Sequence, residues 1–222
     1  EVIGQGNPPG ATYHSPANIS IPLDKTLAAQ SHVVISRKDY KNTVLQLSTV
    51  QGDSIRIQLE KVIRYRPLYS LVFPVNSAVL GFRDKIIAVT IAPRETNFDL
   101  NILNLAQKPI AVYWDTAEYT DVRHQPHRVF PSTVRLEDRG GEISPQTIPV
   151  GGTLQVSVTP LDSVSYAGVK GYVVKPLFVL DNDSALDLIG KTIKLSFSVA
   201  VGGAIIIPSY MLKIRIDDVI AE

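Results

Sequence analysis

Apolar residues recur at every second position in many short stretches of this chain. In residues 98–105 they fall mainly on alternate positions, and residues 154–159 repeat the alternation before Pro160. Period-two alternation is typical of a β-strand with one buried face, because successive side chains point to opposite faces of a sheet. Over windows of twelve residues no helical period occurs, apart from a single turn near residues 184–189. The pattern therefore predicts an all-β protein.

Turn residues separate the predicted strands at short intervals. Residues 51–53 (Gln-Gly-Asp) are expected to join two strands as a hairpin, and Asp115 with Thr116 is expected to end another strand. Many short strands without helices favour an antiparallel β-sandwich, either immunoglobulin-like or jelly-roll. The predicted strands are residues 33–35, 44–47, 55–59, 71–74, 86–91, 98–105, 110–114, 129–136, 154–159, 172–180, 192–201 and 210–216.

The N-terminal segment differs from the rest because it is rich in Gly, Pro, Asn and Ser. Within it Ile19, Ile21 and Leu23 alternate with Ser20 and Pro22, so we predict one short assembly strand that completes the sheet edge of a neighbouring copy. The alternative is a flexible linker from a membrane anchor. We predict three parts: residues 1–30 as an extended Pro/Gly-rich arm, residues 31–70 as additional β-hairpin strands, and residues 71–222 as the main sandwich.

Composition excludes several functional classes. The 222 residues are 45% hydrophobic, which is enough apolar material for a sizeable core. Lys and Arg number 22 against 21 Asp and Glu, so no overall field favours nucleic acid. The absence of cysteine excludes disulfides, Cys-ligated zinc and thiol nucleophiles. No apolar run is long enough for a membrane-spanning helix.

Two loops carry residues that are able to ligate metal. His124 and His127 follow Asp115, Glu118 and Asp121, a set that suits a metal if the side chains converge. The intervening proline prevents a shared helical face, so we predict a polar loop and no metal site.

Residues 181–187 place Asp181, Asp183 and Asp187 at alternating positions, as calcium loops do. The segment lacks the central Gly and terminal Glu of an EF-hand, and a helix N-terminus capped by Asp181 or Asp183 explains it without an ion. We predict no cofactor, with calcium as the alternative.

Catalytic signatures are missing from the sequence. No Gly-x-Ser-x-Gly elbow, phosphate-binding loop or dinucleotide fingerprint occurs. We therefore predict no catalytic residue and no enzymatic activity. The tyrosines and Trp114 are expected mainly in the core rather than on a carbohydrate-stacking face.

A block of motifs resembles small exported bacterial β-sandwich proteins, many of them lipoproteins. It begins with Asn104-Leu105-Ala106-Gln107-Lys108-Pro109-Ile110-Ala111-Val112-Tyr113-Trp114-Asp115 and spans roughly residues 80–216. Further matching elements are Glu118, Asp121, His127-Arg128-Val129, Pro131-Ser132, Ile148-Pro149-Val150-Gly151-Gly152, Thr159-Pro160 and Gly190-Lys191-Thr192. The chain departs from this pattern by lacking the lipidated N-terminal Cys. The resemblance implies export and a sandwich fold, and it carries no active residue.

These observations lead to one functional expectation and one alternative. We expect a non-enzymatic structural or interaction protein at an extracellular, cell-surface or periplasmic location, which assembles with copies of itself into filaments through its N-terminal strand. A start at Glu1 without a leader is typical of an exported chain after signal-peptide removal, and also of a trimmed chain. The alternative is a monomeric binding module for carbohydrate or another envelope protein, carried on the loops around His124 and Asp183.

Overall fold

The computed structural model describes residues 2–4, 18–22, 32–36, 40–46, 54–59, 62–203 and 209–222. The chain divides into two compact units, Glu1–Arg64 and Tyr65–Glu222. We call them the N-terminal unit and the main unit. The predicted boundaries at residues 30 and 70 stay predictions.

The N-terminal unit contains two small antiparallel sheets. One has the order β1-β3-β4, and the other pairs β2 with β5. The hairpin predicted between residues 44–47 and 55–59 is wrong, because β4 pairs with β3 and β5 pairs with β2. Turn residues favour a local reversal of the chain direction, but they do not decide which strands pair with each other. The strands are β1 (Val2–Gly4), β2 (Asn18–Pro22), β3 (His32–Ile35), β4 (Thr43–Gln46) and β5 (Ser54–Gln58).

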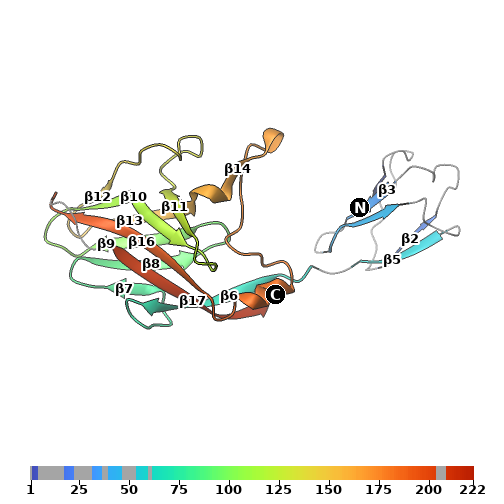
Figure 1. The fold of residues 1–222 in the computed structure, drawn as a ribbon, viewed down its shortest axis with the longest axis horizontal. Helices are drawn as coiled ribbons and strands as arrows, with labels where there is room; N and C mark the ends of the chain where they lie inside the picture. Colours follow the sequence, from blue (N-terminus) through green and yellow to red (C-terminus); the bar gives the residue numbers. More distant parts are fainter. Residues whose placement is uncertain are drawn as a thin grey trace. The chain divides into compact units, whose positions relative to one another are not determined.

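The main unit is built on one ten-stranded antiparallel sheet that curls until it is nearly closed, like a barrel (Figure 1). Its order is β6-β17-β16-β10-β11-β13-β9-β8-β7, and β12 pairs with β10 beside this path. The all-β, antiparallel prediction is confirmed, whereas the sandwich, whether immunoglobulin-like or jelly-roll, and the extended arm stay predictions. The strands are β6 (Tyr65–Phe73), β7 (Gly81–Arg83), β8 (Ile87–Pro93), β9 (Phe98–Asn104), β10 (Ile110–Thr120), β11 (Pro126–Pro131), β12 (Gln146–Ile148), β13 (Thr153–Pro160), β16 (Thr192–Val201) and β17 (Tyr210–Ala221).

A small hairpin and short helical turns complete the main unit. The strands β14 (Val164–Tyr166) and β15 (Tyr172–Val174) pair only with each other in the described sheets. The helical turns are η2 (Leu161–Ser163), η3 (Gly168–Lys170) and η4 (Asp183–Leu188). In the described ranges, none of the helices has the length and apolar character needed to cross a bilayer.

Alternate residues of the strands fill the interior of the curled sheet. In β9, Phe98, Leu100 and Ile102 are buried while the intervening residues face outward. Burial of these side chains supplies the main stabilisation of the fold. The largest fully buried side chains of the main unit are Trp114, Phe98, Phe197, Leu71, Ile87, Ile102, Ile110, Ile148, Ile193, Leu195 and Leu212.

Strand β10 continues through the residues that were expected to end it. Tyr113 pairs with Ser198 and Glu118 pairs with Ser196, so the strand has extra residues at this point that form a bulge. A bulge bends a strand and increases its twist without ending the pairing. The first half of β10 consequently pairs with β12 and its second half with β11. The prediction that Asp115 and Thr116 end the strand is wrong.

The edge strand β6 offers little free backbone for another strand. The Tyr65 N–H donates to the Leu180 oxygen at 2.8 Å, and Leu71 and Ser77 exchange two hydrogen bonds of 2.8 Å each. Alternate residues of β6 direct their backbone groups to this outer edge, and one of these residues, Pro67, has no N–H to donate. Proline and local bridges protect an edge against unwanted pairing. At the other end of the sheet, β7 has only three residues.

Candidate functional site

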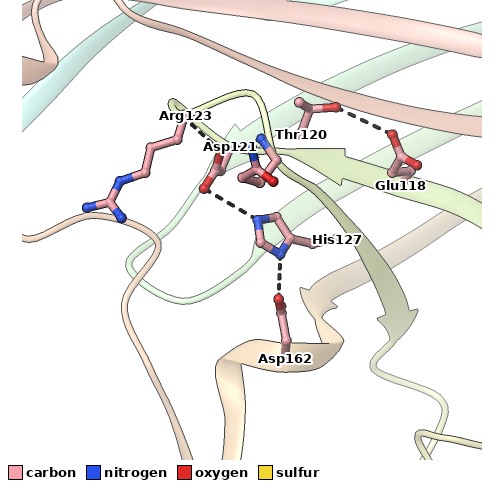
Figure 2. Close-up of polar contacts among 7 residues, drawn as sticks. Glu118, Thr120, Asp121, Arg123, His127 and Asp162 are labelled. Atoms are coloured by element: carbon pink, nitrogen blue, oxygen red, sulfur yellow. Dashed lines mark hydrogen bonds and ion pairs between the residues drawn. The ribbon is translucent and has the colours of Figure 1, made fainter.

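A histidine and two carboxylates meet beside the turn between β10 and β11 (Figure 2). His127 lies on β11; its Nδ1 is 2.5 Å from Oδ2 of Asp162, and its Nε2 is 3.4 Å from Oδ2 of Asp121. Asp162 belongs to η2, 35 residues further along the chain. We call these three residues the His127 clasp, because the ring connects the β10–β11 turn to η2.

The turn itself orients Asp121. Its Oδ1 accepts the N–H groups of Arg123 and Gln125, each at 2.8 Å. An aspartate that accepts bonds from the next few residues stabilises a turn locally. His124, in the middle of the turn, has a φ of 63°, in the left-handed region that few residues adopt. The other oxygen of Asp121 is thereby directed toward His127 (Figure 2).

The neighbours of the ring favour its protonated form. Partial burial alone lowers the pKa of His127, but the hydrogen bonds to Asp162 and Asp121 outweigh this effect, and the pKa is raised above its ordinary value. Burial alone raises the pKa of Asp121. The N–H groups of Gln125 and Arg123 and the His127 ring outweigh this effect, so the pKa of Asp121 is lowered below its ordinary value. Both shifts stabilise an ion pair at mildly acidic pH.

The His127 clasp lacks the geometry of a metal site. Asp121 and Asp162 contact opposite nitrogens of one ring, so their oxygens do not converge on one ion. Asp115 instead accepts a backbone N–H at 3.1 Å, and Glu118 contacts a threonine hydroxyl. Across the described ranges, no group of three or more His, Asp or Glu side chains is placed to hold a metal ion.

The acidic segment 181–187 forms the helical turn η4. Its N-cap is Asn182, whose side chain accepts a backbone N–H at 3.0 Å, rather than Asp181 or Asp183. Asp183 accepts the hydroxyl of Tyr65 at 2.7 Å. The capping prediction therefore identified the helix start but the wrong residue. The carboxylates of this described segment do not converge on a calcium position.

The raised pKa of His127 makes stability depend on pH. A raised folded-state pKa stabilises the fold below the unfolded value of about 6.5, and this contribution disappears as pH rises through the folded pKa. We expect the free energy of unfolding to fall by about 0.5–1 kcal/mol between mildly acidic and alkaline pH, a small value because His127 is only partly buried and Asp162 is exposed to solvent. Urea denaturation at several pH values measures it, with His127→Gln as the control. A variant with the same pH profile as the parent would contradict this assignment.

The His127 clasp holds the root of the β14–β15 hairpin. Asp162 lies in η2, directly before β14, and the Lys175 N–H donates to the Ser163 oxygen at 2.9 Å, which closes the root. Tyr166 pairs with Tyr172 near the other end. In Figure 1 the hairpin projects away from the curled sheet. The β10–β11 turn and the hairpin root are thus fastened together.

The tip of the hairpin exposes apolar side chains. Gly168 and Gly171 have φ values of 58° and 70°, which glycine adopts without strain, and they flank the tip. Val169 is fully exposed between them. Tyr166 is 69% exposed and Tyr172 is 37% exposed, and their rings are 5.3 Å apart in an edge-on arrangement. Such a group of exposed apolar residues is typical of an interaction site.

The charges near the tip are basic. Residues 163–180 contain Lys170 and Lys175 and no acidic residue. The Arg139 guanidinium lies 4.9 Å from the centre of the Tyr172 ring, a cation–π contact that steadies the tyrosine. The hairpin therefore combines an apolar tip with positive charge.

A second exposed apolar surface lies where η4 meets the end of β17, and it is acidic. The Gly190 N–H, just after η4, donates to the Ile216 oxygen at 2.8 Å, and Leu68 pairs with Asp218 across β6 and β17. Arg66 and Arg215 each pair with one acid, and Lys191 after η4 adds one more cation, so the six acids of this surface still outnumber its cations. We call this surface the acidic end. It comprises the exposed residues Leu68, Leu186, Ile189 and Ile220 and the acids Asp181, Asp183, Asp187, Asp217, Asp218 and Glu222.

Sequence reasoning found parts of these surfaces and missed others. The strand predicted over residues 172–180 extends only over β15, and β14 was not predicted at all. The sequence signal that could have revealed the β14–β15 hairpin was the pair of glycines, Gly168 and Gly171, between two tyrosines. Trp114 is buried as expected, but Tyr166 is not.

The predicted assembly strand lies in the N-terminal unit. Ile19 and Ile21 belong to β2, opposite Ile57 and Ile55 of β5. Leu23 lies outside the described residues. Donation of this strand to a neighbouring copy stays a prediction.

No family model, curated protein or solved structure matches this chain. The resemblance to exported bacterial β-sandwich proteins therefore stays a prediction.

Proposed function

We propose that this chain is a non-enzymatic structural or interaction protein of the cell exterior or envelope that associates with copies of itself. In this proposal the β14–β15 hairpin of one copy docks onto the acidic end of the next. The observation that carries the proposal is the full exposure of Val169 beside two exposed tyrosines, on a hairpin whose charges are all basic.

The two surfaces are complementary in two respects. Each exposes apolar side chains whose removal from water is worth about 25 cal/mol per Å². The hairpin is positive and the acidic end is negative, which favours encounter and correct orientation. Because the two surfaces differ, the contact is heterologous, and repeated head-to-tail contacts produce a ring or an open filament.

The state of the His127 clasp supports a non-catalytic role. Both ring nitrogens of His127 contact carboxylates, so neither is free to accept a proton from a substrate. The clasp instead orients the hairpin root, which reduces the entropy lost when the tip docks.

Strand exchange through Ile19 and Ile21 is a second route to self-assembly. In the N-terminal unit β2 already pairs with β5, so donation requires either that this pair opens or that β2 uses its second edge. Pro67 and the Leu71–Ser77 bridge block much of the β6 edge of the main unit. These contacts favour the hairpin over the N-terminal strand as the main assembly element.

Sedimentation velocity across a concentration series tests the proposal. We expect the double variant Tyr166→Ser, Val169→Ser to weaken self-association roughly 30-fold, from the loss of about 2 kcal/mol of apolar burial. Lys170→Glu should weaken association most at low salt, because surface charges are screened as salt rises. Val150→Ser changes another exposed valine, 56% exposed and in a different turn, and serves as the control.

Each result separates the alternatives. Association that is unchanged by the hairpin variants but lost in Ile19→Ser, Ile21→Ser would favour strand exchange and contradict hairpin docking. A parent chain that stays monomeric at all concentrations would contradict self-assembly. The remaining hypothesis would then be a monomeric binding module for another envelope protein.

A further inference from the structure

A pocket of about 460 Å³ lies on the outer face of the main sheet, over β8, β9 and β13. Small side chains at Ala92 and Ser157 leave the surface hollow, and Ser132, just after β11, forms one wall. The hydroxyl oxygen of Ser132 accepts the Ser157 N–H at 3.3 Å, which ties this wall to the sheet. Two rows of cross-strand neighbours form the floor: Thr90, Asn101 and Gln155 in one row, and Ala92, Asp99 and Ser157 in the next.

The first row presents free hydrogen-bonding groups. Thr90, Asn101 and Gln155 are exposed, and within the described residues their side chains make no hydrogen bond. Each amide supplies two N–H donors and one carbonyl acceptor, and the threonine hydroxyl supplies both kinds of group. These groups stand on three adjacent hydrogen-bonded strands, so the backbone fixes their spacing before any ligand arrives.

The second row supplies an oriented acceptor with little net charge. The carboxylate of Asp99 accepts the Ser157 hydroxyl at 2.6 Å and the Arg94 Nε–H at 2.6 Å. The hydrogen bonds from Ser157 and Arg94 lower the pKa of Asp99. Because Arg94 balances the one acid of the lining, the pocket selects neither a strong anion nor a cation.

We propose that this pocket binds a neutral polyhydroxylated ligand, namely one or two sugar units of a glycan. Its volume lies in the range of small-molecule sites, about 300–1,000 Å³. Neighbouring sugar hydroxyls both donate and accept, which matches two amides, the hydroxyls and one carboxylate on a rigid floor. No aromatic side chain is among the described lining residues, so binding rests on hydrogen bonds and is expected to be weak, with a roughly millimolar Kd.

An NMR titration of the full chain tests the pocket with maltose, cellobiose and diacetylchitobiose as probes. We expect at least one of them to shift the backbone amide signals of β8, β9 and β13 in a saturable way at up to about 50 mM. Asn101→Ala and Gln155→Ala should each raise the Kd about 5- to 10-fold, because each removes one bidentate group. Gln107→Ala deletes an exposed amide in another turn and is the matched control.

The outcomes are distinct. Saturable shifts confined to the pocket and weakened only by the two pocket variants support the proposal. Absence of shifts with all three sugars, or shifts that persist in the Asn101→Ala, Gln155→Ala double variant, would overturn it. Displacement of the sugar by an equal concentration of inorganic phosphate would also overturn it, because it would indicate an anion site. The result does not depend on hairpin docking, which uses other residues.

Discussion

Replacing Trp114 by alanine is expected to lower the free energy of unfolding of the main unit by about 3–5 kcal/mol. Trp114 is fully buried, its ring contacts that of Phe197 with 6.1 Å between centroids, and its Nε1–H donates to Gln146 Oε1 at 2.6 Å. The substitution creates a large cavity at the bend of β10 and leaves Oε1 of Gln146 without the indole donor.

Urea denaturation followed by circular dichroism measures this effect, and Tyr113→Ala is the control. Tyr113 is the preceding residue on β10 and is 40% exposed, so its loss should change stability by less than about 1 kcal/mol. Equal losses for the two variants would contradict the assignment of Trp114 to the core.

Replacing Asn104 by alanine should destabilise the main unit by about 2–4 kcal/mol. Asn104 is 1% exposed and lies at the end of β9. Its side-chain nitrogen donates to the carbonyl oxygens of Lys108, Ile148 and Pro149 at 3.0–3.1 Å, and its side-chain oxygen accepts the Ala106 N–H at 2.9 Å. Alanine removes all four of these bonds at once, including the buried one to the Ile148 oxygen, which is more costly than the loss of one exposed hydrogen bond.

Asn104→Asp provides a sharper version of the same test. An aspartate replaces the donor with a second acceptor, which then faces three carbonyl oxygens, so we expect a larger loss than for alanine. Asn101→Ala, three residues earlier and exposed, should change stability by less than about 0.5 kcal/mol. A similar loss in all three variants would contradict the role assigned to Asn104. The same control also checks that Asn101→Ala is suitable for the sugar titration.

The two proposed binding surfaces, the β14–β15 hairpin and the pocket, depend on different kinds of residue. Hairpin docking depends on exposed apolar residues such as Val169, which the fold itself does not need. The pocket depends on polar residues of strands whose opposite faces build the core, such as Asn101 between Leu100 and Ile102. Substitution at either surface should therefore affect the proposed binding with little effect on the free energy of unfolding, whereas substitution of Trp114 or Asn104 should lower that free energy.

Strand existence was predictable from local patterns. The alternation in residues 98–105, 154–159 and 192–201 matches β9, β13 and β16, since period two follows directly from the geometry of an extended chain with one buried face. The same reasoning failed where the chain departs from ideal pairing. Asp115 and Thr116 have the composition of a turn, but the β10 bulge accommodates them because β16 and β11 supply partners on both sides.

The sequence by itself therefore determined that this protein is β-rich and antiparallel, that a core of alternate apolar residues is available, and that cysteine chemistry is excluded. Only the tertiary structure decided which strands pair, that Asp162 meets His127 across 35 residues, and that Thr90, Asn101 and Gln155 form one row on three strands. The physical reason is that alternation and turn propensity act between near neighbours, whereas the choice of partner depends on the burial of the whole sheet, which no single segment encodes.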